Sequence, residues 1–229
     1  MKYFIHLILL FSCCIQAQTK EAVLARVSAE YAAARPLQFT AVYNLYKDPQ
    51  SKTIAETYKG NFYKNAANEI YLKINTTEYF ATKKINIQVN HDEKAILVKK
   101  PQAIPQDQFN ITKLLETFQH GYFKDQKTYW EMELLAKKSS ALPYSKIVIR
   151  IGKDYFIQKQ VFYYSTAINF SKDYTKRDVH KPKLEITFSK ASRESIAPGR
   201  FDTTPYITIT KKGIKLSEKF SSYELIDQR

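Results

Sequence analysis

The residue types that most often carry catalysis or bind metals are few in this chain of 229 residues. The four histidines, His6, His91, His120 and His180, lie far apart, and none has a partner two to five residues away that suggests a zinc site. No G-x-S-x-G or H-E-x-x-H motif occurs, and five glycines are too few to build a glycine-rich phosphate loop. The sequence therefore predicts no metal site, no cofactor and no enzymatic activity.

Two pairs of carboxylates are close enough in sequence to act together in acid–base chemistry. Asp92 and Glu93 lie in a predicted turn, and Glu131 and Glu133 share one face of a predicted strand. Catalytic carboxylates have a pKa tuned by their surroundings, whereas turns and outer strand faces usually expose theirs to solvent. We interpret both pairs as solvated side chains.

The only two cysteines, Cys13 and Cys14, belong to an N-terminal segment typical of export signals. Lys2 is a minimal positive region, residues 4–11 (FIHLILLF) are apolar, and Ala17-Gln18 fits a signal-peptidase site. The apolar run is well short of the roughly 20 residues that span a bilayer. We predict that residues 1–17 are a signal peptide and that the mature chain, residues 18–229, lies in a bacterial periplasm without a disulfide.

A second interpretation of the same segment tethers the protein to a membrane. Residues 10–13 (LFSC) resemble a bacterial lipobox, in which Cys13 would carry the lipid. Phe11 fits this motif poorly, because its position usually holds a small or modest aliphatic side chain. Removal of both cysteines is the favoured hypothesis, and a lipid anchor on Cys13 is the alternative.

The chain is basic, with 36 lysines and arginines against 22 aspartates and glutamates, which gives a formal charge of +14. No block of five like charges occurs, and this thin spread is typical of a solvated surface. A basic surface also suits an anionic lipid or an acidic partner. We expect no binding to nucleic acid, because the chain carries an export signal and none of the RNA- or DNA-binding motifs.

Hydrophobic periodicity predicts a single domain built mainly of strands. Residues 20–35 favour a helix that Thr19 caps and Arg35-Pro36 ends, and residues 110–123 favour a second helix with Gly121 near its end. Elsewhere the apolar residues alternate, so we predict about ten strands joined in sequence like an antiparallel meander. The predicted strands are 37–46, 53–64, 69–74, 86–89, 95–100, 129–138, 145–151, 155–164, 183–188, 206–209 and 221–226.

A sheet that curves strongly around a short helix would enclose an apolar concavity. The high aromatic content, 17 tyrosines and 14 phenylalanines, favours this hypothesis. The alternative, that the same side chains fill a packed core, remains open. The candidates for lining the concavity are Phe39, Tyr43, Phe62, Leu72, Ile87, Val98, Leu115 and Phe118.

The order of these elements resembles that of the periplasmic lipoprotein carrier LolA and its outer-membrane receptor LolB. The local match is best at residues 60–74 (GNFYKNAANEIYLKI), 89–101 (VNHDEKAILVKKP) and 149–164 (IRIGKDYFIQKQVFYY), each containing two strands joined by a short turn. The resemblance covers about residues 22–210. Residues 211–229 have no clear counterpart, and we predict an extra edge strand there.

The resemblance implies an α+β fold in which a single curved antiparallel sheet forms an incomplete, half barrel. The N-terminal helix and a short central helix would then cover an apolar cavity that takes acyl chains. On this hypothesis the protein is a monomer that carries acyl chains of lipoproteins or lipids toward the outer membrane and meets membrane-bound envelope partners. The alternative hypothesis is a non-enzymatic envelope interaction module with a packed core and a basic docking surface.

One turn departs from the family pattern. The first of the matching hairpins usually contains an Arg-Pro pair, whose arginine helps hold the lid closed, whereas residues 64–68 here read KNAAN. This departure argues against an opening-and-closing cycle and leaves lipid binding unaffected.

Overall fold

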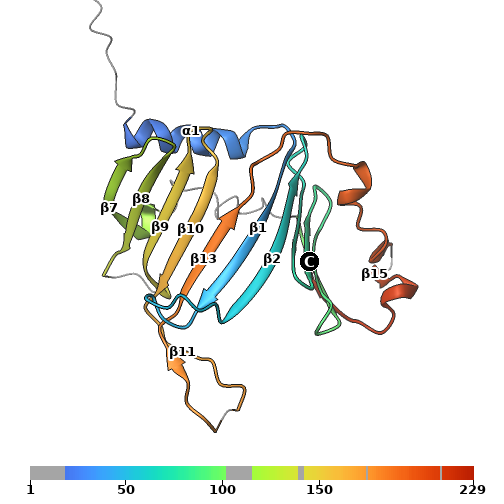
Figure 1. Ribbon diagram of the computed structural model, residues 1–229. Coiled ribbons are helices and arrows are strands. Elements are labelled where there is room, and N and C mark those ends of the chain that lie inside the picture. The colour runs from blue at the N-terminus through green and yellow to red at the C-terminus, as the bar shows by residue number, and fades with distance from the viewer. Residues whose placement is uncertain (1–18, 102–114, 139–141, 174, 212) are drawn as a thin grey trace, which may run out of the picture.

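Most strands of the protein belong to one large sheet (Figure 1). The computed structural model describes residues 19–101, 115–138, 142–173, 175–211 and 213–229. The strands of the large sheet are β1 (Leu37–Tyr46), β2 (Glu56–Lys64), β3 (Ile70–Ile74), β4 (Thr77–Ala81), β5 (Asn86–Asn90), β6 (Ala95–Lys99), β7 (Phe118–Asp125), β8 (Tyr129–Ala136), β9 (Tyr144–Gly152), β10 (Ile157–Tyr164), β13 (Lys183–Phe188) and β16 (Glu224–Gln228). Four short strands form two separate hairpins, β11 (Ile168–Asn169) with β12 (Val179–His180) and β14 (Ile207–Thr210) with β15 (Gly213–Leu216).

The large sheet is open rather than closed into a barrel. Its twelve strands have the order β16-β6-β5-β4-β3-β2-β1-β13-β10-β9-β8-β7, so β16 and β7 are its two edges. Neighbouring strands are antiparallel, except that β16 pairs parallel to β6. The antiparallel pairing of β1 with β13 joins the two halves, although these strands are far apart in sequence. The predicted half-barrel architecture is therefore confirmed, and residues 224–228 form the expected edge strand.

The helix α1 (Lys20–Ala32) follows directly from the local sequence. The Thr19 hydroxyl accepts a hydrogen bond from the Ala22 amide at 3.3 Å and so satisfies one of the free amides of the first turn. Val23, Val27 and Tyr31 recur on one face and are buried. The predicted helix is confirmed, although it ends three residues earlier than expected.

Side chains of α1 pack on one face of the sheet, and the sheet curves around them. The strand register places Phe39 of β1 opposite Phe62 of β2 on this face, with their rings stacked at 4.6 Å. One apolar cluster contains these residues, side chains of α1, and the same face of β8 and β9, although five strands lie between β3 and β8 in the sheet. Because strands so far apart in the sheet share one cluster with α1, this face is the inner one. The cluster is Val23, Leu24, Val27, Tyr31, Leu37, Phe39, Phe62, Ile70, Phe118, Trp130, Met132, Leu134, Ile147, Ile149, Ile151 and Ile157.

The outer face of β3 to β6 is covered by the C-terminal segment. This segment, residues 196–223, includes two short 3-10 helices, η2 (Pro198–Phe201) and η3 (Glu218–Phe220), besides β14 and β15. Phe201, Ile207 and Phe220 are buried there against the outward side chains of the strands. The buried members of this second cluster are Tyr71, Phe80, Ile85, Ile87, Val89, Ile96, Val98, Phe201, Ile207 and Phe220.

The predicted second helix needs correction, and some strands were not predicted. Other expectations concern residues outside the described part of the chain. The predicted helix 110–123 is helical only at residues 115–117 of its described part, because from Phe118 onward the chain pairs with β8 as strand β7. Gly121 lies at the irregularity in this pairing, where a β-carbon would be only 2.5 Å from Oε1 of Glu133. Strands β4, β11, β12 and β15 were not predicted. The signal peptide 1–17 with Cys13 and Cys14, and residues 110–114 of the predicted helix, lie outside the described residues.

Two cations hold the C-terminal end of α1 against the sheet. Lys64, 1% exposed at the end of β2, donates from Nζ to the carbonyl oxygens of Tyr31 at 2.5 Å and Ala33 at 2.7 Å. Arg193 donates to the Glu30 carbonyl at 2.8 Å and to the Pro36 carbonyl at 3.1 Å. Burial, together with nearby Arg193 and Arg35, lowers the pKa of Lys64 to about 8. The last turn of a helix leaves its carbonyls without partners, and these side chains supply donors.

Replacing Lys64 should therefore loosen α1. We expect Lys64→Met to lower the free energy of unfolding by about 1–3 kcal/mol, because the buried carbonyls of Tyr31 and Ala33 lose their donors. Urea denaturation followed by tryptophan fluorescence measures the change. The matched control is Lys59→Met, an exposed lysine on the same strand, for which we expect a change within about 0.5 kcal/mol. Equal effects of the two substitutions would contradict this role for Lys64.

Candidate functional site

Beyond α1, the inner face of the sheet carries a second set of apolar side chains that are only half-buried. They come from β1, β3, β10 and β13, and the register places them on the same face as Phe39 and Phe62. Leu184 of β13 lies between Leu45 of β1 and Phe162 of β10. We call this set the inner apolar face, and it consists of Tyr43, Leu45, Leu72, Ile74, Phe162 and Leu184.

The strands that carry the inner apolar face are those with the clearest alternation in the sequence. Every second residue of β1, from Leu37 to Leu45, points inward. Gly60 of β2 leaves room for the ring of Tyr43, since a β-carbon at this position would lie 3.0 Å from that ring. Burial raises the pKa of the Tyr43 hydroxyl, so this group stays neutral at physiological pH.

One buried polar group lies beside the inner apolar face. Gln160 of β10 pairs with Ile149 of β9 and Ile186 of β13, faces inward, and is 4% exposed. Within the described part of the chain its Nε2 atom has no hydrogen-bond acceptor. A buried amide without an acceptor costs roughly 1–3 kcal/mol. Gln160 therefore offers a free hydrogen-bond donor at an otherwise apolar position.

The structure brings six of the eight predicted lining residues to the inner face. Phe39, Phe62 and Phe118 are buried in the cluster under α1, and Leu72 and Leu115 pack half-buried against it. Tyr43 follows Phe39 on the same face of β1. Ile87 and Val98 lie instead on the outer face, fully buried in the cluster under the C-terminal segment. Alternation separated the two faces of β5 and β6 correctly, but the apolar face of these strands points outward, because the C-terminal segment covers it, whereas Gln88 on the inner face is exposed.

A network of hydrogen bonds fastens the C-terminal segment to the outer face around Glu78. This carboxylate is 7% exposed and accepts from the hydroxyls of Tyr71 at 2.6 Å and Tyr206 at 2.9 Å. His91 contacts it through Nε2 at 2.8 Å and contacts Tyr223 through Nδ1 at 2.9 Å. Burial by itself raises the pKa of Glu78, but hydrogen bonds from Tyr71, His91 and Tyr206 outweigh it and lower the pKa to about 2. A carboxylate held this firmly in its ionised form is a weak base, so the network is suited to fastening rather than to proton transfer.

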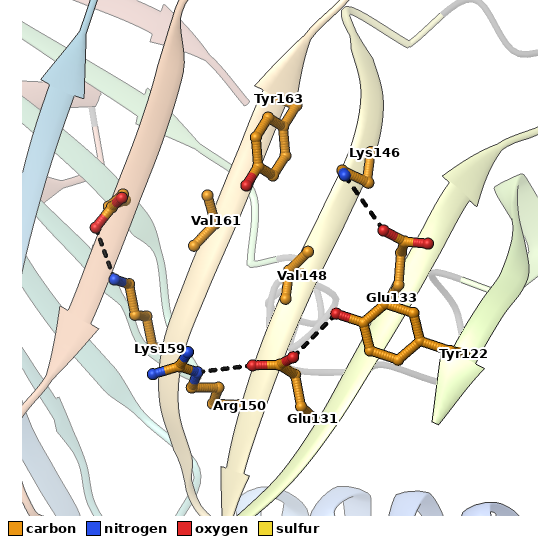
Figure 2. Close-up of a pocket in the computed structure, with 10 residues that line it drawn as sticks. Tyr122, Glu131, Glu133, Lys146, Val148, Arg150, Lys159, Val161 and Tyr163 are labelled. Carbon is orange, nitrogen blue, oxygen red and sulfur yellow. Dashed lines mark hydrogen bonds and ion pairs between the residues drawn. The ribbon is translucent and has the colours of Figure 1, made fainter. Parts of the chain in front are cut away.

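The outer face of β7 to β10 and β13 carries a shallow polar basin of about 300 Å³ (Figure 2). Val148 and Val161 form its floor, and the charges around it are arranged in cross-strand pairs. Glu131 accepts from Nε of Arg150 at 2.9 Å and from the Tyr122 hydroxyl at 3.0 Å. The other pairs are Glu133 with Lys146 at 3.2 Å and Glu185 with Lys159 at 2.7 Å.

The ion pairs of the basin determine the protonation state of the carboxylates that were predicted to share one strand face. Burial alone raises the pKa of Glu131, but the hydrogen bonds from Arg150 and Tyr122 outweigh it and lower the pKa below its usual value. A carboxylate that stays ionised and paired neither donates nor accepts a proton near neutral pH. The basin is therefore a ladder of cross-strand ion pairs, in which Glu131 and Glu133 are paired and only 18% exposed rather than solvated as predicted.

Two structural features are absent among the described residues. No group of three or more histidine, cysteine, aspartate or glutamate side chains is close enough there to hold a metal ion. Within the same residues, no helix combines the length and hydropathy needed to cross a membrane.

Comparison with known proteins adds structural neighbours of low sequence identity. No protein-family model and no curated protein sequence matches the chain. An uncharacterized conserved protein from Thermus thermophilus shares the fold, with a TM-score of 0.50 and 11% identity over 91% of this chain and 98% of that chain.

Two further neighbours have lower TM-scores. A LolA superfamily protein from Nitrosomonas europaea has a TM-score of 0.36 and 9% identity, covering 81% of this chain and 98% of that chain. A protein from Vibrio parahaemolyticus, described as an outer-membrane lipoprotein-sorting protein domain, has a TM-score of 0.35 and 13% identity, covering 80% and 95%.

The Glu78 network predicts a specific dependence of stability on pH. Because folding lowers the pKa of Glu78 from an ordinary 4.5 to about 2, its ionised form stabilises the fold above pH 4.5, and this contribution is lost as the pH falls toward 2. We expect Glu78→Gln to lower the free energy of unfolding by about 2–4 kcal/mol at pH 7. The difference from the unsubstituted protein should shrink steadily between pH 5 and pH 2.

Urea unfolding at a series of pH values measures this difference. The control is Glu218→Gln, an exposed carboxylate of the same C-terminal segment, which should change little at any pH. A difference for Glu78→Gln that stays constant from pH 7 to pH 2 would overturn the assignment.

Proposed function

We propose that this protein binds a long acyl chain against the inner apolar face and acts as an exported, non-catalytic carrier of lipid or lipoprotein acyl groups. The observation that carries the proposal is the half-buried set Tyr43, Leu45, Leu72, Ile74, Phe162 and Leu184 on the inside of an open half-barrel. Apolar surface that is half-buried on a concave face gains stability when a ligand covers it. Each methylene group removed from water contributes about 0.8 kcal/mol, so ten methylenes contribute about 8 kcal/mol before the costs of association.

The chemistry of this face favours a neutral, extended ligand. Its side chains are aliphatic or aromatic, and Leu45, Leu184 and Phe162 lie side by side on three neighbouring strands. They form an apolar track across the strands, which suits a flexible hydrocarbon chain better than a compact polar molecule. The ionic pairs described above belong to the opposite, outer face.

The side chain of Gln160 favours a ligand with an acyl carbonyl over a plain hydrocarbon. It lies two residues before Phe162 on the same strand and therefore on the same face, about 7 Å away. Its Nε2 atom needs an acceptor, and the carbonyl oxygen of an ester or amide is one. An acyl chain lying along Phe162 would bring such a carbonyl close to Gln160, and a side-chain movement that uncovers the buried Nε2 atom would complete the hydrogen bond.

The remaining predicted residues take positions around this ligand. Phe39 and Phe62, together with Phe118, close the upper limit of the site under α1, and Leu115 packs beside them. Ile87 and Val98 take no part, since they support the C-terminal segment on the outer face. The export signal at residues 1–17 supports a periplasmic location, in which a monomeric carrier would shelter acyl chains on their way to the outer membrane.

A charge on the inner apolar face tests the proposal directly. We expect Leu72→Glu to weaken binding of a fluorescent long-chain fatty acid at least tenfold, because a carboxylate would be buried beside the hydrocarbon. Fluorescence titration of the mature protein measures the affinity, and circular dichroism monitors folding.

The matched control is Lys59→Glu on the outer face of the neighbouring strand β2, which should bind like the unsubstituted protein. Ile74→Trp, which adds bulk without charge, should also weaken binding if Leu72→Glu proves unstable. Equal affinities for Leu72→Glu, Ile74→Trp and Lys59→Glu would refute the proposal.

Gln160→Leu should stabilise the protein and at the same time weaken its binding of an ester ligand. Removing a buried amide without an acceptor should raise the free energy of unfolding by about 1 kcal/mol, whereas binding of a fatty-acid methyl ester should weaken about 2- to 10-fold. Binding of a hydrocarbon probe of equal length should not weaken. A loss of stability, or an equal loss of affinity for both probes, would exclude the assigned role of Gln160.

A further inference from the structure

A hairpin projects beyond the large sheet at the end opposite α1 (Figure 1). It consists of residues 165–173 and 175–182 and contains β11 and β12. The loop between β1 and β2, residues 47–55, lies at the same end. Strands β1 and β10 are both antiparallel to β13, so both run away from α1, and the segments that follow them lie at the far end of the sheet. We call these two segments together the basic tip.

Ionic contacts join the two segments of the basic tip. Lys47 of the loop contacts Asp178 of the hairpin at 2.5 Å, and its ammonium group lies 5.7 Å from the ring centre of Phe170. His180 contacts Asp178 through Nε2 at 2.7 Å and Asp48 of the loop through Nδ1 at 3.2 Å. The hydrogen bonds from His180 to Asp178 and Asp48 raise the pKa of the imidazole. The hairpin is thus held in a defined position against the loop.

Exposed apolar side chains concentrate on the basic tip. The described residues include three large hydrophobic side chains that are exposed, and two of them, Ile54 at 45% and Val179 at 52%, lie on the basic tip. The third, Ile209 at 50%, belongs to the C-terminal segment on the outer face. Single exposed hydrophobic residues are ordinary, but two at one projecting end, among cations, need an explanation.

The basic tip carries a surplus of positive charge around these two residues. It contains six basic side chains (Lys47, Lys52, Lys172, Lys176, Arg177 and Lys181) and three acidic ones (Asp48, Asp173 and Asp178). Asp48 and Asp178 are engaged by His180 and Lys47, and Asp173 by Lys176. Within the described part of the chain, Lys52, Lys172, Arg177 and Lys181 make no salt bridge. The turn between β5 and β6, at the same end of the sheet, contributes Asp92, Glu93 and Lys94, so this end of the sheet is not basic throughout.

We propose that the basic tip docks on an anionic lipid surface. Its cations would lie against lipid phosphates, each contributing about 1 kcal/mol near an anionic membrane, while Ile54 and Val179 enter the boundary between headgroups and acyl chains. A surface that combines cations with exposed aliphatic side chains is complementary to this boundary. An acidic protein would satisfy the cations but gives no reason for two exposed aliphatic side chains at the same end of the molecule.

The docked orientation connects the membrane with the inner apolar face. Leu45 of β1 and Leu184 of β13 lie one residue from the strand ends at which the basic tip begins. An acyl chain leaving the bilayer at the basic tip would meet these residues first and would not have to pass α1. This route depends on the proposed acyl-chain site, whereas the membrane docking itself does not.

Vesicle flotation of the mature chain tests the docking. We expect binding to vesicles of 70% phosphatidylcholine and 30% phosphatidylglycerol at 50 mM NaCl, at least tenfold weaker binding to pure phosphatidylcholine, and loss of most binding at 500 mM NaCl. The double variant Ile54→Ser/Val179→Ser and the triple variant Lys172→Gln/Lys176→Gln/Arg177→Gln should each bind at least tenfold more weakly.

Two matched controls keep the outcome interpretable. Ile209→Ser removes the third exposed hydrophobic side chain, and Lys83→Gln/Lys84→Gln/Lys127→Gln removes three exposed lysines at the α1 end; both should bind within twofold of the unsubstituted protein. Docking is overturned if the protein fails to bind the anionic vesicles, binds both vesicle types equally, or loses as much binding in the controls. Fatty-acid titration of the basic-tip variants in solution separates the two proposals, since loss of docking should leave that affinity unchanged.

Discussion

The size of α1 relative to the sheet that it covers governs the rest of this structure. A helix of 13 residues is about 20 Å long, whereas twelve strands at about 4.8 Å spacing form an arc of roughly 55 Å. The helix can bury the inner face only at one end of the strands, where Leu37, Phe39 and Ile149 are almost inaccessible to solvent. Toward the other end of β1, the inner residues Tyr43 and Leu45 are half-buried. The partial cover divides one continuous apolar face into a packed core and a surface that a ligand can complete.

The two faces of the sheet differ in what covers their apolar side chains. On the outer side of β3 to β6, the C-terminal segment covers the apolar surface and is fastened through Glu78 and His91. On the outer side of β7 to β10, paired charges take the place of apolar residues, so no cover is needed. On the inner side, Lys64 and Arg193 fix α1 at one end. Lys64 is the first residue of the KNAAN turn, so a cation contacts the end of the helix although the turn contains no arginine.

The sequence was sufficient where local signals and tertiary packing agree. Thr19 predicted the start of α1, and the alternation of β1 and β13 matched their observed bounds because one face of each is clearly more apolar than the other. The helix prediction for residues 118–123 was wrong, because their helical spacing competes with pairing to β8, which depends on residues farther along the chain. The short strand β4 was missed because its five residues offer little periodicity. The orientation of Ile87 and Val98 could not be inferred either, because the segment that covers them lies about 100 residues farther along the chain.

The central claim is that the inner apolar face holds an acyl chain, and native mass spectrometry of the protein tests it most directly. The protein would be purified without denaturant or detergent and its mass compared with that of the mature polypeptide. The account predicts a population carrying an additional mass that tandem fragmentation identifies as an acyl-containing lipid or lipopeptide. A mass equal to the polypeptide alone, unchanged after incubation with lipid and lipopeptide, would contradict the account and show that the inner face is completed without a ligand.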